Sequence, residues 1–319
     1  MRQLPLYDEL MSRERIFANG FIDKLFIHTH SIRHNFIKTN FKHNYFDQKE
    51  EDSHYMEGSQ YEHRESGKVF FLLSGPFFKN VEHPYFIQIN PSQFGSYEEL
   101  VGFLRLIMGR RGFEAHHLTR VDVSIRLPRD LFPIHLFRAT TYFRWKRGIV
   151  EKGSKYSNGY LSGYYSGKSK TLRVSIYDVD IKNRQLYGKV TDYRQTNFEL
   201  QARVNFLKKN GIRMIGDLPK MTNTDLFKRL SFVNTIEYKA SILPERREKF
   251  VRVQQDLLDG GYHNARIRLN KECGRNFNRN YRGVLRVFRV GAGQESLRGF
   301  LAKSFKKSFL QWCGADSIH

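Results

Sequence analysis

Cysteine is almost absent from the sequence. The 319 residues include two, Cys273 and Cys313, with no CxxC pair and no Cys/His cluster at zinc-finger spacing. A disulfide framework and a structural zinc site are therefore excluded as the basis of the fold. This pattern indicates a protein that works in a reducing compartment, and we expect a cytoplasmic location.

Long apolar runs are also missing. No stretch approaches 18 uninterrupted apolar residues, and the first segment, MRQLPLYDELMSRERIF, has charges throughout instead of the apolar core of a signal peptide. Basic residues are spread through strand-like segments and are not gathered on one amphipathic helix. The sequence thus predicts a protein with no membrane partner.

Acidic residues are too few to balance the basic ones. The chain carries 54 Lys and Arg against 32 Asp and Glu, a formal net charge of +22, together with 27 Phe and 17 Tyr. That aromatic content is typical of a folded body with its charge on the surface, not of a disordered basic tail. Such a surface binds polyanions, so we expect DNA or RNA affinity that falls steeply with salt. A ribosome-associated RNA-binding protein, or a basic protein with no specific nucleic-acid function, is the alternative.

The chain is rich in strand patterns with interspersed helices. Ser96 opens a capping-box pattern with Glu99 ahead of an apolar helical stripe that ends near Gly109–Gly112. Residues 40–67 are polar and mixed in charge, which predicts a loop or an irregular excursion. Strands are expected at 21–31, 69–75, 84–92, 118–127, 171–179 and 197–204, with a hairpin turn at 166–170. The predicted class is α+β: a curved, largely antiparallel sheet backed by helices, with a helical basic C-terminal part.

Three of these strands each have one apolar and one polar face. Alternation along a strand places Asp122, Tyr177 and Glu199 on the polar faces, opposite Val, Ile and Leu side chains. If the strands are neighbours, these three residues share a surface with Arg120, Arg173 and Arg203. Any antiparallel sheet with one solvated face shows the same alternation, so the pattern alone also fits a protein without catalysis.

The residue types on this face fit phosphodiester chemistry. Two carboxylates, Asp122 and Glu199, can hold one Mg²⁺ or Mn²⁺ through oxygen ligands. A tyrosine such as Tyr177 becomes a nucleophile if the metal and the arginines Arg120 and Arg173 stabilise its phenolate. The product would be a phosphotyrosine, which preserves the bond energy needed to rejoin the strand.

At these residues the chain resembles the rolling-circle replication initiation factors of plasmids and phages, in the transposable-element-type Rep family. The matching segments are LTRVDVSI at 118–125, YYSGKSKTLRVSIYD at 164–178 and NFELQAR at 197–203. Filamentous-phage replication proteins are a more distant resemblance. The resemblance implies that Tyr177 is the nicking tyrosine and that Asp122 and Glu199 bind the metal. It also implies that the substrate is the DNA of a replication origin, in both double-stranded and single-stranded form. A host helicase and a DNA polymerase are implied partners, and a homodimer is left open.

The sequence departs from the family pattern at three places. Arg126 stands where the family has a second Asp. Val179 stands where the family has a Lys, and the Glu that follows in the family is not evident, which leaves Asp180 or Lys182 to compensate. The Arg ahead of the strand Glu is displaced to Arg194. These departures favour, as an alternative, a non-catalytic DNA-binding regulator on the same fold.

Histidines give a competing hypothesis. His28 and His30 share one face of the first strand, an arrangement used by another class of nicking enzymes, although Thr29 stands where that class has a bulky apolar residue. His116 and His117 adjoin the Asp122 strand and are interpreted as loop or DNA-contacting residues.

The C-terminal region carries basic and aromatic residues in alternation. A helix is predicted from Pro244 to Gly260–Gly261, and we divide the chain into a Rep-like nicking and DNA-binding domain, 1–240, and a basic helical region, 241–319, packed on it. Arg, Asn and aromatic side chains at short intervals suit phosphate contact and base stacking. The predicted DNA-binding residues are Lys168, Lys170, Arg203, Arg266, Arg268, Arg275, Arg279 and Arg282.

Overall fold

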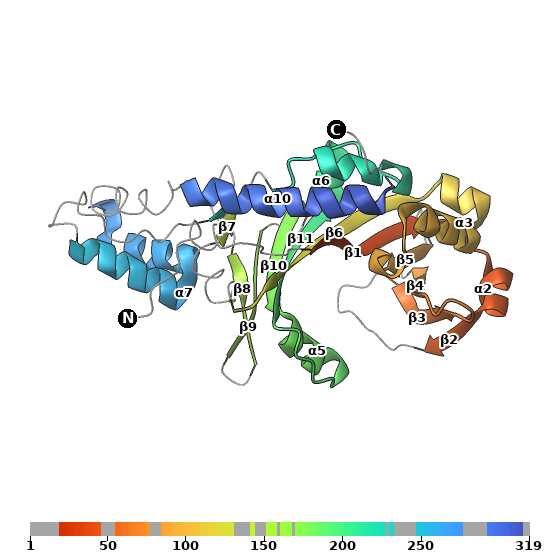
Figure 1. The fold of residues 1–319 in the computed structure, drawn as a ribbon, viewed down its shortest axis with the longest axis horizontal. Coiled ribbons are helices and arrows are strands. Elements are labelled where there is room, and N and C mark those ends of the chain that lie inside the picture. Colours follow the sequence, from red (N-terminus) through yellow and green to blue (C-terminus); the bar gives the residue numbers. More distant parts are fainter. Residues whose placement is uncertain are drawn as a thin grey trace.

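The computed structural model describes residues 19–45, 55–76, 84–130, 141–143, 151–157, 160–167, 170–227, 230–232, 247–276 and 292–314. Within these ranges ten strands form one open antiparallel sheet in the order β2-β3-β4-β5-β1-β6-β11-β10-β9-β8 (Figure 1). The α+β class predicted from the sequence is confirmed. The strands are β1 (Asn19–Thr29), β2 (Phe41–Tyr45), β3 (Tyr55–His63), β4 (Val69–Pro76), β5 (Tyr85–Ile89), β6 (His117–Pro128), β8 (Glu151–Ser157), β9 (Tyr160–Gly167), β10 (Leu172–Asp178) and β11 (Gln195–Arg203).

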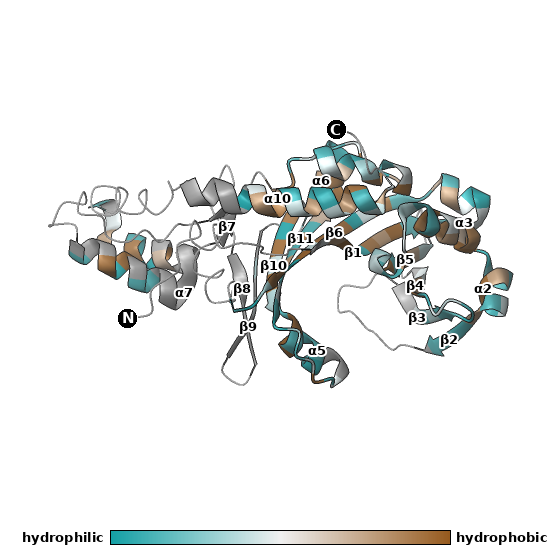
Figure 2. Cartoon of the chain, viewed as in Figure 1, coloured by the Kyte–Doolittle hydropathy of each residue, from teal (hydrophilic) through white to brown (hydrophobic). Residues whose placement is uncertain are grey.

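Helices cover one face of the sheet. In Figure 1, α3 (Tyr97–Glu114), α6 (Val204–Lys209) and α10 (Ala292–Trp312) lie along one side, and α5 (Val179–Tyr187) lies on the other. The 3-10 segment η2 (Ile215–Asn223) adds to the helical layer through its buried apolar residues. In Figure 2 hydrophobic and hydrophilic residues alternate along the central strands. The apolar side chains pack under the helices, which leaves the polar side chains of these strands on the opposite face.

The C-terminal helix α10 contributes to the main core. Leu301, Phe305 and Phe309 are buried in the same apolar cluster as the strand residues. The approach to β1 is close, because a Cβ atom on Gly20 would lie 2.5 Å from the Cα of Phe305. Any larger residue at position 20 would therefore push α10 off the sheet. The proposed boundary between residues 240 and 241 lies outside the described residues.

The helix at the start of the basic region is longer than predicted. Helix α7 (Arg247–Cys273) continues through Gly260–Gly261, so the predicted stop was wrong. Each internal glycine costs a helix about 1 kcal/mol, but buried residues on both sides, Val253 before the pair and Leu269 after it, offset that cost. The short 3-10 segment η4 (Gly274–Asn276) follows, and α7 contacts β7 (Thr141–Phe143), which pairs with β12 (Leu230–Phe232) in a separate two-stranded sheet.

The segment 40–67, predicted to be a loop, contains two strands. β2 and β3 extend the sheet beyond β4, and Tyr61 of β3 stacks on Phe70 of β4 with ring centroids 5.3 Å apart. The described side chains of β3 are only partly buried, so the apolar alternation that reveals a strand in sequence is missing there. Elsewhere the predicted strands are confirmed, as is the helix beginning after Ser96, whose hydroxyl accepts a hydrogen bond from the Glu99 amide. No helix in the described part of the chain meets the length and hydropathy needed to cross a membrane.

Candidate active site on the polar face of the sheet

The strands that carry Asp122, Glu199 and Tyr177 are adjacent in the sheet, and the three side chains lie on its polar face. Strand β11 lies between β6 and β10, and its register pairs Asn197 with both Arg126 and Tyr177. Two residues further along, Glu199 pairs with Ser124 and Ser175. The prediction that residues 118–127, 171–179 and 197–204 form neighbouring strands with a shared polar face is confirmed, because the register keeps alternate residues aligned across the three strands.

Tyr177 sits in a hydrogen-bonded cluster. Its hydroxyl donates to Glu199 Oε2 over 3.3 Å and accepts from Asn197 Nδ2 at 2.5 Å. The same Asn197 nitrogen lies 3.0 Å from Ser124 Oγ. Because three strands contribute to this cluster, the sheet fixes the direction in which the phenol oxygen points.

A second chain of hydrogen bonds leads away from Glu199. Gln201 donates to Glu199 Oε1 at 2.7 Å, and Arg203 donates to Gln201 Oε1 at 3.1 Å. Both oxygens of Glu199 thus have a defined partner, one of which is the tyrosine. Arg203, predicted to contact DNA, is the last member of this series of hydrogen bonds and the last residue of β11.

Asp122 is fully buried and paired. Arg120 donates to both carboxylate oxygens, each at 2.6 Å, and the Arg120 guanidinium lies 4.4 Å from the ring centroid of Phe26. Arg120 is thereby fixed against one ring and one carboxylate. Asp122, the predicted metal ligand, therefore has both of its carboxylate oxygens hydrogen-bonded to Arg120.

A third carboxylate, Asp23, belongs to the site and was not predicted. It lies in β1 at a register irregularity between Ile22 and Lys24, where one extra residue opposes β6. Burial raises the pKa of Asp23, and the charge of Glu199 raises it further. The available signal was a single acid in a strand whose other residues are neutral or basic, but alternation gives no direction for a residue at a bulge.

Burial and mutual repulsion dominate the electrostatics of these acids. Desolvation, and then the charge of Glu199, raise the pKa of Asp122 to about 7. The pKa of Tyr177 is raised well above 10, first by burial and then by the charges of Glu199 and Asp23. Burial and the charge of Glu199 thus outweigh the nearby cations at Asp23 and Asp122, and an added cation would stabilise these carboxylates and a phenolate.

Lys182 supplies one positive charge from outside the sheet. It lies on α5, and its Nζ is 3.7 Å from the centroid of the Tyr177 ring. Desolvation lowers its pKa, while Glu199 and Asp23 act in the opposite direction. Lys182 was one of the two residues expected to replace the lysine missing at Val179, and its position beside the tyrosine fits that role.

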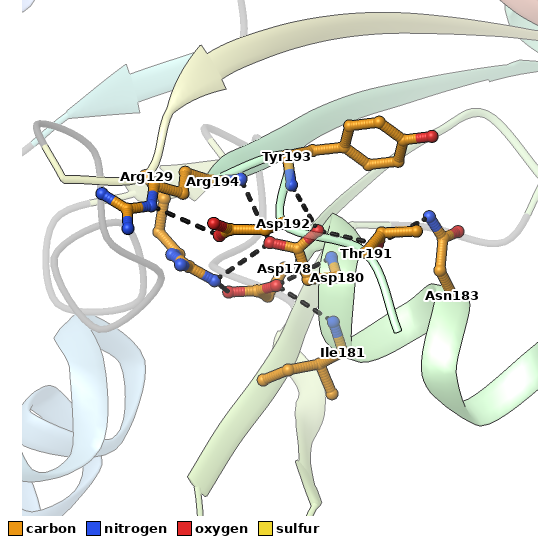
Figure 3. A network of polar contacts seen from close by, with 9 residues as sticks. All are labelled: Arg129, Asp178, Asp180, Ile181, Asn183, Thr191, Asp192, Tyr193 and Arg194. Carbon is orange, nitrogen blue, oxygen red and sulfur yellow. Dashed lines mark hydrogen bonds and ion pairs between the residues drawn. The ribbon is translucent and has the colours of Figure 1, made fainter. Parts of the chain in front are cut away.

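Asp180, the other expected replacement, holds the backbone around α5 (Figure 3). Asp180 accepts from Thr191 Oγ1 and the Tyr193 amide, each at 2.8 Å, and from the Arg194 amide at 3.1 Å. Asp178 caps α5 through the Asp180 and Ile181 amides, and Arg129 bridges both aspartates at 3.0 and 3.2 Å. This network fixes the helix that carries Lys182.

Arg194 does not join the active-site cluster. Its exposed side chain pairs with Asp192 at 3.3 Å (Figure 3), and its backbone has φ 49°, in the left-handed region. The expectation that it replaces the family's strand arginine has no support in this geometry. Its contribution is its backbone amide, which donates to Asp180.

Two further arginines on the polar face lie against aromatic rings. The Arg173 guanidinium is 4.5 Å from the Tyr165 ring centroid, and that of Arg126 is 5.1 Å from the Phe21 centroid. Burial lowers the pKa of Arg173, and its Nε has no hydrogen-bond partner among the described residues. A half-buried arginine whose Nε donor is unused is suited to an incoming phosphate oxygen.

The paired-histidine hypothesis is not supported. β1 ends at Thr29, so His30 lies in the bend beyond the strand, and the His28 ring packs edge-on against Phe86 with centroids 4.9 Å apart. Within the described ranges, no group of three or more His, Cys, Asp or Glu side chains is arranged to hold a metal ion. His116 lies in the loop between α3 and β6, as interpreted from the sequence, and it is buried there, where it accepts from the Ile215 amide at 2.7 Å.

The predicted DNA-binding residues are only partly described. Lys170 is exposed beside the β9–β10 turn, and Arg268 pairs with Asp256 on α7. The side chains of Arg266 and Arg275 are not described, although both lie in helical segments. Lys168, Arg279 and Arg282 lie outside the described residues.

Comparisons with known proteins add little to this geometry. No family model matches the sequence, and no curated protein matches it. Among solved structures, a rolling circle replication initiator protein from Geobacillus stearothermophilus is similar over 77% of this chain and 99% of its own, with 13% identity and a TM-score of 0.39. A likeness at that level carries no argument about function.

The pKa of Asp122 predicts an unusual dependence of stability on pH. The ordinary pKa of an aspartate is 3.8, and that of Asp122 in the folded protein is about 7. Between these two pH values the folded protein keeps a proton on Asp122 that the unfolded chain has released. The free energy of unfolding therefore falls as the pH rises through this window. Asp122→Asn removes that penalty. We expect the variant to melt at a higher temperature than wild type at pH 8 with a chelator present, with the gain shrinking toward pH 4. A variant less stable than wild type at pH 8 would contradict the proposed burial cost.

Proposed function

We propose that this protein is an enzyme that cuts one strand of DNA and rejoins it through a covalent bond to Tyr177. One observation carries the proposal: the Tyr177 hydroxyl donates a hydrogen bond to Glu199 while Lys182 lies against its ring. A tyrosine that is hydrogen-bonded to a proton acceptor and lies beside a cation has the arrangement needed for nucleophilic catalysis.

The residues divide the chemical step among them. The Tyr177 oxygen attacks the phosphorus, its proton passes to Glu199, the bond from phosphorus to the 3′ oxygen breaks, and the 3′ oxygen takes a proton from water. Arg173 lies on the same face with an unused donor for a phosphate oxygen. The protein keeps the 5′ phosphate as a phosphotyrosine, and the reverse reaction rejoins the strand without a further energy source.

The donor set fits a hard divalent cation. Asp122 and Glu199 would hold Mg²⁺ or Mn²⁺, and the Asn197 side-chain carbonyl, two residues from Glu199 on β11, is a further oxygen that is buried without a hydrogen-bond partner among the described residues. When bound, the cation would polarise the phosphate and lower the pKa of the phenol. Because Arg120 donates to both oxygens of Asp122, cation binding competes with that ion pair.

Within this class we infer the role of an initiator of rolling-circle replication. The order of the three motifs resembles that of plasmid and phage initiators, and a net charge of +22 suits a partner that is a nucleic acid. In this role the protein nicks a replication origin, leaves a 3′ hydroxyl for a polymerase, and rejoins the displaced strand at termination. A host helicase and a DNA polymerase are the proposed partners.

The direct test is a nicking assay on supercoiled plasmid DNA that carries candidate origin sequences, with Mg²⁺ or Mn²⁺. We expect relaxed, nicked circles and a fraction of DNA that enters the phenol phase because protein is attached to its 5′ end. Chelation should stop both. If wild-type protein binds the DNA tightly and never forms either product, the proposed enzymatic activity is contradicted.

The second candidate function is a DNA-binding regulator that has lost catalysis. The closed Arg120–Asp122 pair favours it, because a carboxylate held by arginine on both oxygens needs no metal. Arg126 and Val179, where the family has an acid and a lysine, agree with that alternative. Binding without cleavage in the nicking assay would support it.

Lys182 provides a separate test of the site. We expect Lys182→Met to slow nicking roughly 100-fold, the usual cost of removing one preorganised charge from a reacting oxygen, with DNA affinity changed by less than about threefold. Lys182→Arg should recover part of the rate and shift its pH profile upward, since arginine keeps its charge at all relevant pH values. The exposed Lys189, beyond the end of α5, is the matched control. Equal rates for the methionine variants of both lysines would exclude Lys182 from the reaction.

A further inference from the structure

A cavity of about 440 Å³ lies at the end of the central strands away from Tyr177. It forms where β11 ends and the chain turns into α6, beside the first residues of β6. Leu118, Val204 and Ile212 line its interior, and Leu118 and Ile212 are buried. This volume is within the range of pockets that hold one small organic ligand.

The rest of the lining is basic or polar and more exposed. Lys208 and Arg213 are exposed side chains that line the cavity, as is His117, and His28 is half-buried opposite it in the β1–β6 pair. An apolar interior with cations around it matches a ligand that has a flat base at one end and a phosphate at the other.

Continuous contacts join this cavity to the candidate active site. The His28 ring contacts Phe86, Phe86 contacts Phe26 at 5.7 Å between centroids, and the Phe26 ring lies under Arg120, which holds Asp122. The register places Tyr177 level with Arg126, nine residues beyond His117 on β6, which is roughly 30 Å along a strand. A single strand of DNA several nucleotides long can span that distance and contact the reacting tyrosine and the cavity together.

We propose that this cavity, formed by the β6 start and the α6 turn, binds one nucleotide of the single strand of DNA that the enzyme cuts, with the base inside and its phosphate on Lys208 and Arg213. The proposal rests on the proposed function and deepens it, because it fixes where the strand lies relative to Tyr177. One held nucleotide sets which phosphate reaches the tyrosine.

The test measures binding of a short fluorescent single-stranded DNA by anisotropy, without a divalent cation, so that cleavage has no influence. We expect Arg213→Gln to weaken binding roughly five- to tenfold and to reduce the salt slope by about 0.7, the share of one phosphate contact. Lys209→Gln, an equal charge change on the same exposed segment outside the cavity, should stay within about twofold. Melting temperatures check that both variants fold.

A second series removes one base at a time from the strand. We expect one position to weaken wild-type binding more than the others, and Val204→Phe, which fills the cavity, to erase that difference. Equal binding by the Arg213 and Lys209 variants, a flat abasic series, or tighter binding of RNA of the same sequence would each overturn the cavity proposal. Wild-type protein that binds no single-stranded DNA at all would instead contradict the proposed function.

Discussion

Replacing Tyr177 with Phe should abolish both strand cleavage and the covalent protein–DNA adduct while leaving DNA affinity nearly unchanged. The substitution removes the one oxygen that would bond to phosphorus, so the expected loss is at least about 10⁴-fold, down to the background of the assay. The ring remains between Lys182 and the sheet, and net charge does not change. The measurements are plasmid nicking, gel detection of the adduct and DNA binding by anisotropy.

Loss of the Tyr177 hydroxyl also frees Glu199 and Asn197 from one hydrogen bond each, so the variant should be checked for stability. We expect a change in the free energy of unfolding of at most about 1 kcal/mol, because Asn197 keeps its contact with Ser124. Tyr164 and Tyr165 on the neighbouring strand are the rival nucleophiles. Tyr165 has its ring under Arg173, and the register pairs it with Ser175, two residues from Tyr177 on β10. An adduct that persists in Tyr177→Phe and maps to either residue would show that the nucleophile was assigned wrongly.

Neutralising the carboxylates should give the second-largest effect. We expect Asp122→Asn and Glu199→Gln each to slow nicking roughly 10²- to 10³-fold, with part of the rate restored by raised Mn²⁺, because these changes weaken a cation site without removing the nucleophile. Glu199→Gln should be the more severe, since Glu199 also accepts the hydrogen bond of the Tyr177 hydroxyl. The measurement is the nicking rate as a function of Mn²⁺ concentration.

The matched control is Asp192→Asn, a neutralised exposed carboxylate that pairs with Arg194 outside the site. It should nick at the wild-type rate. If the Asp122 and Glu199 variants lose activity that no concentration of Mn²⁺ restores, the metal assignment is wrong and the carboxylates act through Arg120 and Tyr177 alone. If they nick as fast as the control, neither carboxylate takes part.

The central strands and their polar face were predictable because their signal is local. Side chains alternate with a period of two, so buried Val121, Val123 and Ile125 fix the direction of Asp122 wherever β6 lies. The edge strand β2 and its neighbour β3 were missed, because the described side chains of β3 are all partly buried and therefore show no apolar alternation. The length of α7 was underestimated, because local glycine cost was weighed without the tertiary packing on either side of the pair.

The candidate active site was likewise predictable only in part. The sequence alone determined the residue types, their order and the face on which Asp122, Tyr177 and Glu199 lie, since these follow from composition and from the geometry of a single strand. Only the tertiary structure decided three further features. Asp23 lies at a bulge of β1, Arg120 forms an ion pair with Asp122, and Lys182 on α5 packs against the Tyr177 ring. Those contacts depend on strand register and helix placement, which arise from packing between segments distant in the chain and leave no periodic trace in the sequence.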